Sequence, residues 1–170
     1  MPQFMLDTGD QESTRRFETL DSFTQGYIEA LFFTDQEQLC EESGRDMPAV
    51  AVNRDTMETR FIGGDSPGFG DLAAKTLEKI IADCKSFQER NAAFIEAASE
   101  LEPGSEGLRY AREALDDRRL GQLFWYARNG HGVAFTDDGD SVILKALQVR
   151  AQGFRQVDSG MGDDGKIYLD

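Results

Sequence analysis

The chain has 170 residues, with 32 Asp and Glu against 18 Lys and Arg, so its formal net charge is −14. This balance argues against direct binding of nucleic acid, which relies on clustered Lys and Arg, and favours a cationic partner or a surface that is simply well solvated. Hydrophobic residues make up 39% of a chain that is long enough to bury a core, so we expect residues 1–170 to form a single domain.

The start of the chain and its cysteines indicate a cytoplasmic setting. The sequence begins Met-Pro-Gln-Phe-Met-Leu-Asp, without the basic start and long apolar run of a signal peptide. No stretch approaches the ~18–20 apolar residues of a membrane span, so we expect no membrane partner. Cys40 and Cys84 are far apart, and Cys84 falls on the apolar face of an expected helix, which predicts a buried thiol.

The first elements in chain order are a polar lead-in and a helix. Residues 1–16 are polar and mixed, which suggests a flexible lead-in. Apolar residues then recur at helical spacing at Leu20, Phe23, Tyr27 and Leu31. This spacing predicts a helix over Asp21–Phe33, and the acidic residues 35–46 suit either a short helix or a loop.

The middle of the chain predicts a hairpin, a loop and a long helix. Ala49–Val52 and Arg60–Ile62 are short β-prone runs that predict the arms of a hairpin, and the Gly-rich residues 63–70 predict a loop. The longest helical pattern runs from Asp71, whose carboxylate suits a helix start, to Leu101, shortly before a Pro-Gly pair.

The last third of the chain predicts a hairpin, a helix and a second hairpin, after a helical pattern over Leu108–Leu120. Aromatic runs flank an Asn-Gly pair within Phe124–Asp140, which predicts a hairpin because Asn and Gly accept the positive φ of a tight turn. Ser141 suits the cap of the next helix. A second hairpin would join Phe154–Asp158 to Lys166–Leu169 through an Asp-Gly turn. Two hairpins can share one small antiparallel sheet with helices packed on it, so we predict an α+β fold.

The first hairpin contains the only His and the only Trp of the chain. His131 lies between two glycines, and it suits either a base on an exposed turn or a structural turn residue. No second His and no Ser or Cys in an activating context accompanies it, so we predict no catalytic residue. An enzyme, or a protein that binds a small ligand or a nucleotide, is the alternative hypothesis for this turn, with Trp125, Arg128, Asn129 and His131 as its ligand site.

The sequence predicts no metal site and no cofactor. Asp137–Asp140 and Asp163–Gly165 resemble parts of calcium loops, but neither completes the required spacing with a final Glu, and Asp-Gly pairs are ordinary turn formers. Residues 63–70 precede a helix as a phosphate-binding loop would, but they lack the Lys-Ser/Thr ending and include Asp65, which would repel phosphate.

Acidic residues are concentrated in the first third of the chain. Residues 1–65 hold 14 acidic and 5 basic residues, a net charge of −9. A solvated helix face explains such residues without any function. The alternative is a surface whose spaced carboxylates imitate DNA phosphates and pair with the Lys and Arg of a basic groove. The candidate partner-binding residues are Glu29, Asp35, Glu37, Glu41, Glu42 and Asp46.

Four stretches of the chain carry a family resemblance. They are Leu20–Ala30, Leu77–Cys84, the motif Phe-Trp-Tyr-Ala-Arg-Asn-Gly-His-Gly at Phe124–Gly132, and the ending Gly-Asp-Asp-Gly-Lys-Ile-Tyr at Gly162–Tyr168. Together they resemble a family of small acidic, functionally uncharacterised proteins of bacteriophages and mobile elements. Relative to that pattern, residues 44–70 look like an insertion or loop segment.

The resemblance implies a phage accessory role in the cytoplasm of the host cell, and it supplies no catalytic residues. Small acidic phage proteins are often inhibitors of host defence. With the charge, it leads to the hypothesis of a non-enzymatic, DNA-mimicking inhibitor of the anti-CRISPR or anti-restriction type, whose partner is a cationic host protein or nuclease complex. A structural or assembly partner in the phage particle, or a homodimer, is a further hypothesis.

Overall fold

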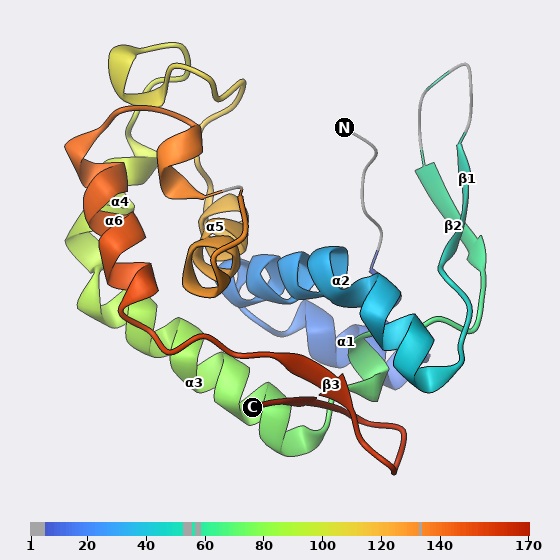
Figure 1. Cartoon of the computed structure of the whole chain (residues 1–170). Helices are drawn as coiled ribbons and strands as arrows, with labels where there is room; N and C mark the ends of the chain where they lie inside the picture. The colour runs from blue at the N-terminus through green and yellow to red at the C-terminus, as the bar shows by residue number, and fades with distance from the viewer. Residues whose placement is uncertain (1–5, 53–55, 57–58, 133) are drawn as a thin grey trace. The chain divides into compact units, whose positions relative to one another are not determined.

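A computed structural model of the chain describes residues 6–52, 56, 59–132 and 134–170 (Figure 1). Its helices are α1 (Gln11–Glu18), α2 (Ser22–Ser43), α3 (Ala74–Arg90), α4 (Ala92–Ser99), α5 (Asp117–Asn129) and α6 (Val142–Gln152). Its strands are β1 (Ala49–Val52), β2 (Thr59–Gly63), β3 (Ser159–Met161) and β4 (Ile167–Leu169). β1 pairs with β2, and β3 with β4, both antiparallel. The predicted α+β fold, with a small antiparallel sheet at the C-terminus, is confirmed.

The described residues divide into two compact units. Unit 1 comprises the described parts of Met1–Leu20, Leu31–Leu77 and Asp158–Asp170, and unit 2 comprises Asp21–Ala30 and the described parts of Glu78–Val157. The division falls within α2 and α3, so each of these helices contributes one segment to each unit.

Unit 1 begins with α1, which lies partly within residues 1–16. The Asp10 carboxylate caps this helix by accepting a hydrogen bond from the Ser13 N–H at 2.8 Å. Phe17 is the buried residue of α1, and its ring packs edge-on against Phe69, with the ring centroids 5.2 Å apart. An apolar contact therefore joins the N-terminal helix to the segment that precedes α3.

Unit 2 is built around aromatic rings. Phe87 of α3 stacks on Phe124 of α5 with the ring centroids 4.1 Å apart, and Phe23 of α2 lies against both rings. The N-terminal part of α2 crosses α5 closely. A Cβ atom on Gly26 would lie 1.9 Å from a carbonyl oxygen of α5, and one on Gly121 would lie 1.9 Å from a carbonyl oxygen of α2. Both positions therefore require glycine.

Several predicted elements are confirmed. α2 contains the predicted helix Asp21–Phe33 and continues to Ser43, so most of residues 35–46 is helical. The β1–β2 pair matches the predicted hairpin. Ser141 caps α6, because its Oγ accepts a hydrogen bond from the N–H two residues on at 3.1 Å. A C-terminal hairpin also forms, with Gly165 at a φ of 71° in its turn, but its first strand β3 begins only at Ser159, after the predicted arm Phe154–Asp158 has ended.

The predicted hairpin within Phe124–Asp140 is wrong. Its first residues, Phe124–Asn129, form the end of α5, and Gly130 terminates that helix with a φ of 70°. α5 is buried all round at this end, because every residue from Leu123 to Arg128 is buried. An Asn-Gly pair can end a helix as readily as it can form a hairpin turn, because both structures need a positive φ. The C-terminal sheet therefore contains one hairpin, β3–β4, and not two.

The predicted helix over Leu108–Leu120 is also wrong in position. Only a short 3₁₀ turn, η2 (Glu106–Leu108), precedes α5. α5 begins at Asp117 because the Asp116 carboxylate accepts a hydrogen bond from the Arg119 N–H at 2.7 Å and so caps its first turn.

The long helical pattern from Asp71 to Leu101 starts later than predicted and is interrupted. Asp71 does not begin α3. Its carboxylate instead accepts a hydrogen bond from the Gly68 N–H at 2.9 Å and closes a 3₁₀ turn, η1 (Phe69–Asp71). The buried Asn91 then separates α3 from α4, which ends near Leu101 as predicted.

Candidate functional site

The C-terminal half of α2 has one buried side and one acidic side within unit 1. Its buried side consists of Gln36, Leu39 and Cys40. Successive helix residues are about 100° apart, so Glu37, Glu41 and Glu42 fall on the opposite side of the helix. All three are exposed. This half of α2 thus separates apolar packing from a line of carboxylates.

The β3–β4 hairpin is attached along one edge of that acidic side. The Ser159 Oγ donates to Asp35 at 2.6 Å, and the Ser159 carbonyl accepts from Gln38 at 3.2 Å. The Met161 N–H donates to Glu42 at 2.8 Å. The hydrogen bonds from Gln38 and from Met161 lower the pKa of Glu42, so this carboxylate is held ionised. Asp35 and Glu42 therefore position the hairpin.

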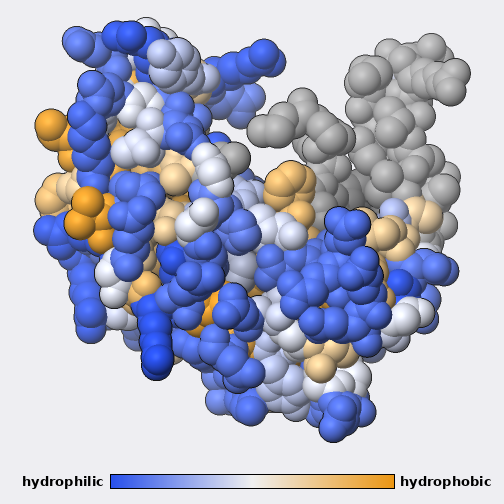
Figure 2. Space-filling model, viewed as in Figure 1, coloured by the Kyte–Doolittle hydropathy of each residue, from blue (hydrophilic) through white to orange (hydrophobic). Residues whose placement is uncertain are grey.

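The hairpin adds further carboxylates to this surface. Its exposed acidic residues are Asp158, Asp163, Asp164 and Asp170. We call these residues, together with Glu37, Glu41 and Glu42, the acidic face. By sequence, unit 1 holds 17 acidic against 7 basic residues, a net charge of −10, whereas unit 2 holds 15 against 11, a net charge of −4. On the face seen in Figure 2, the coloured residues are mostly hydrophilic, with small apolar patches among them.

The carboxylates of α2 in unit 1 lack cationic partners. Within the described residues, no Lys or Arg forms an ion pair with Asp35, Glu37, Glu41, Glu42 or Asp46. The last turn of α2 also contains no basic residue. The C-terminus of a helix carries a partial negative charge, so acids in the last turn are unfavourable for the helix itself. An external cation would relieve this repulsion.

The remaining two predicted partner-binding residues are placed differently. Glu29 belongs to unit 2, where its carboxylate accepts hydrogen bonds from Arg118 Nε at 2.9 Å and from Gln122 at 3.4 Å. It is therefore already paired. Asp46 follows α2 in unit 1 and is exposed, and its backbone carbonyl accepts a hydrogen bond from Cys40.

The alternative ligand site lies at the end of α5 and not on a hairpin turn. Trp125 is only 1% exposed, and its ring stacks on that of His131 with the centroids 6.2 Å apart. The Asn129 side chain donates to the Trp125 carbonyl at 3.2 Å and accepts from the Val157 N–H at 3.0 Å. The indole and the amide therefore serve packing within unit 2.

Arg128 is the centre of a buried hydrogen-bond network in unit 2. Its Nε donates to the Arg155 carbonyl at 2.7 Å, and its Nη1 donates to the Tyr27 hydroxyl at 3.0 Å and to Asp83 at 2.8 Å. Asp83 also pairs with Lys79 at 2.9 Å. Arg128 therefore joins four segments of unit 2, and these donors are directed into the protein.

The ionisable groups of this network are strongly perturbed. Burial raises the pKa of the Tyr27 hydroxyl well above its ordinary range, so this group stays neutral. Burial would by itself raise the pKa of Asp83, but hydrogen bonds from Lys79 and Arg128 outweigh it and lower that pKa. Both states suit a structural network, because neither group is prepared to exchange protons near neutral pH.

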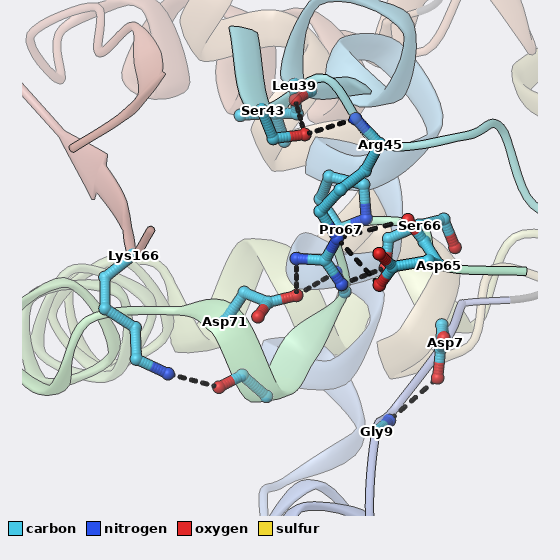
Figure 3. A network of polar contacts seen from close by, with 12 residues as sticks. Asp7, Gly9, Leu39, Ser43, Arg45, Asp65, Ser66, Pro67, Asp71 and Lys166 are labelled. Atoms are coloured by element: carbon cyan, nitrogen blue, oxygen red, sulfur yellow. Dashed lines mark hydrogen bonds and ion pairs between the residues drawn. The ribbon is translucent and has the colours of Figure 1, made fainter. Parts of the chain in front are cut away.

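The Gly-rich residues 63–70 run from the end of β2 into the 3₁₀ turn η1, and one arginine fixes the loop between these two elements. Arg45 Nη1 pairs with Asp71 at 2.9 Å, its Nη2 donates to the Ser66 carbonyl at 2.8 Å, and its Nε donates to Asp65 at 3.1 Å (Figure 3). All three guanidinium nitrogens are thus used within unit 1. The arginine beside this loop is engaged by the protein itself and is not directed at a phosphate.

Sequence reasoning missed a basic pocket in unit 2. Its cavity measures about 440 Å³ and is lined by Arg90, Asn91, Arg150, Gly153, Phe154 and Arg155. These residues come from the end of α3, the end of α6 and the segment that follows α6. The sequence contains no sign of this pocket, because its lining residues come from segments that are far apart in the chain and form no local motif.

Comparison with protein-family models, with curated proteins and with solved structures finds no match. No helix in the described part of the chain is long and apolar enough to cross a membrane. Across the same residues, no three His, Cys, Asp or Glu side chains converge as metal ligands would.

Proposed function

We propose that this protein is a phage-encoded acidic inhibitor that docks its acidic face on a cationic surface of a nucleic-acid-handling host defence complex, of the CRISPR or restriction type. The observation that carries the proposal is the row of exposed carboxylates on α2, which has no cationic partner among the described residues. The phage setting rests on the motif resemblance.

The physical basis is competition for a nucleic-acid-binding groove. A groove that binds phosphates presents Lys and Arg, and these pair with carboxylates in the same way. Glu37 and Glu41 are one helical turn apart, with a rise of about 6 Å between them, so both can meet one row of cations. The net charge of −14 also steers the chain toward a cationic surface.

The proposal is tested with a charge-reversed variant, Glu37→Lys/Glu41→Lys. These two residues are exposed and form no ion pair with the described residues, whereas Glu42 holds the β3–β4 hairpin and is left unchanged. The matched control is Glu102→Lys/Glu113→Lys, which changes the net charge equally at exposed sites of unit 2. Binding and inhibition are measured with purified host restriction nucleases and CRISPR effector complexes.

We expect the wild-type chain to bind and inhibit one such complex and the α2 variant to associate at least tenfold more slowly. The control variant should lose much less. The wild-type association rate should fall as salt is raised, because the Debye length shrinks from about 10 Å at 0.1 M to about 3 Å at 1 M. If the association rate falls equally in both variants, the effect comes from net charge alone and the acidic face is not the docking surface. Unchanged binding of the α2 variant would also refute the acidic face as the docking surface.

A further inference from the structure

The basic pocket of unit 2 is unusual in a chain with such an excess of acid. Three of its lining residues, Arg90, Arg150 and Arg155, are exposed arginines. None of them forms an ion pair with a carboxylate of the described residues. We propose that this pocket, which we call the arginine pocket, binds a small phosphorylated ligand of the nucleotide class.

The arginines suit phosphate in both charge and geometry. A guanidinium presents a planar fork of N–H donors that matches the oxygens of a phosphate, and it remains charged at any physiological pH. Three such groups around one cavity match the several negative charges of a di- or triphosphate. The cavity of about 440 Å³ lies within the ~300–1,000 Å³ that small-molecule sites occupy.

Two contacts hold parts of the pocket in place before any ligand arrives. The Arg150 guanidinium lies over the ring of Phe94, 4.6 Å from its centroid, which restrains this long side chain. The Arg155 carbonyl accepts the 2.7 Å hydrogen bond from the buried Arg128, which fixes the backbone after α6. Preorganised donors lose less conformational freedom when they bind a ligand.

Asn91 supplies an independent sign of an unfilled site. This lining residue is only 3% exposed, and its Nδ2 donates to the Phe87 carbonyl at 2.8 Å. Its Oδ1 is buried and has no hydrogen-bond partner among the described residues. Such an oxygen is unfavourable without a donor. A sugar hydroxyl or an amino group of a nucleotide base would supply one.

A small ligand fits the observations better than a nucleic acid strand. The net charge of −14 repels a long polyanion, and strand binding relies on extended basic grooves. The arginine pocket is instead a confined cluster, and Phe154 adds one aromatic wall to it. A compact anion therefore gains the three local charges while meeting little of the repulsion from the rest of the surface.

The test is calorimetric titration of the full chain with ATP, pyrophosphate and adenosine at low ionic strength. We expect saturable binding of ATP, weaker binding of pyrophosphate and none of adenosine. Pyrophosphate binding as tight as that of ATP would assign the site to inorganic phosphates and overturn the nucleotide class. Tighter binding of a single-stranded oligonucleotide than of ATP would overturn the small-ligand proposal.

The variants are Arg90→Gln, Arg150→Gln and Arg155→Gln, each of which should weaken ATP binding about tenfold or more. The matched control is Arg112→Gln, which removes the same charge at an exposed site of unit 2 outside the pocket. Circular dichroism confirms that the variants fold. Absence of ATP binding at millimolar concentration, or equal losses in the control, would overturn the proposal. The acidic-face proposal is unaffected by either result, because its residues belong to unit 1.

Discussion

Substitution of Arg128 decides between a structural and a ligand-binding role for the end of α5. Arg128→Ala removes the donors that serve the Arg155 carbonyl, the Tyr27 hydroxyl and the Asp83 carboxylate. The Arg128 side chain is only 2% exposed and that of Asp83 is 23% exposed, so little water is available to replace these bonds. If the network is structural, this variant loses stability whether or not a ligand is present.

The magnitude follows from the groups left behind. Removal of one partner from a buried ion pair typically costs about 3–5 kcal/mol. Asp83 retains Lys79 at 2.9 Å, which moderates the cost, whereas the Tyr27 hydroxyl and the Arg155 carbonyl each lose a partner, at roughly 1–3 kcal/mol for a fully buried group. We therefore expect a loss of roughly 3–5 kcal/mol. Tyr27→Phe is the smaller control and should cost about 1 kcal/mol, because it removes only one hydrogen bond.

The assay is urea unfolding followed by Trp fluorescence. Trp125 is the only Trp and is buried in unit 2, so its signal reports on the unit that contains the network. With a slope of about 2 kcal/mol per molar urea, the expected loss lowers the midpoint by about 1.5–2.5 M. A shift of less than about 0.5 M in Arg128→Ala would refute the structural reasoning and return Arg128 to the alternative ligand site.

The remaining predictions concern the helix crossing and alkaline pH in unit 2. Gly121→Ala should destabilise the chain by about 1–3 kcal/mol or more, because its Cβ would lie 1.9 Å from a carbonyl oxygen of α2. Gly132→Ala, with open space around it, should change the thermal midpoint little. Burial raises the pKa of the Cys84 thiol, so stability is complete below the unfolded pKa of about 8.5 and falls by up to about 1.4 kcal/mol per pH unit above it. Cys84→Ala should flatten that slope between about pH 8.5 and 10, as measured by urea titrations, and an unchanged slope would contradict this account.

Signals that act within a few residues were predictable from the sequence. Ser141 caps a helix wherever helical spacing follows it, and Gly165 closes a turn because its positive φ costs little. The pair Asn129-Gly130 was equally visible, but its positive φ serves a helix end and a hairpin turn alike. The two are distinguished by the burial of every residue from Leu123 to Arg128, which depends on contacts with distant segments of unit 2.

Features that depend on distant residues were not predictable. The acidic residues of α2 were visible in sequence, but the hairpin that extends them is joined through Ser159 and Met161, more than a hundred residues later. Likewise, Glu29 looked equivalent to the other acids until Arg118 paired with it. Charge pairing depends on tertiary structure. The sequence therefore identified candidate carboxylates, but it did not show which of them have a cationic partner in the fold.

The charge of a residue in the last turn of a helix shows whether that residue stabilises or destabilises the helix. Arg90 and Arg150 lie in the last turns of α3 and α6, where a cation stabilises the helix, so folding alone accounts for their positions in sequence. Glu41 lies in the last turn of α2, where it opposes the helix dipole. Glu41→Lys should therefore raise the free energy of unfolding by about 0.3–1 kcal/mol while it weakens docking on a cationic partner. A variant that loses stability and binding together would show that Glu41 serves the fold, whereas opposite changes in the two measurements are expected only if this carboxylate is retained for a partner.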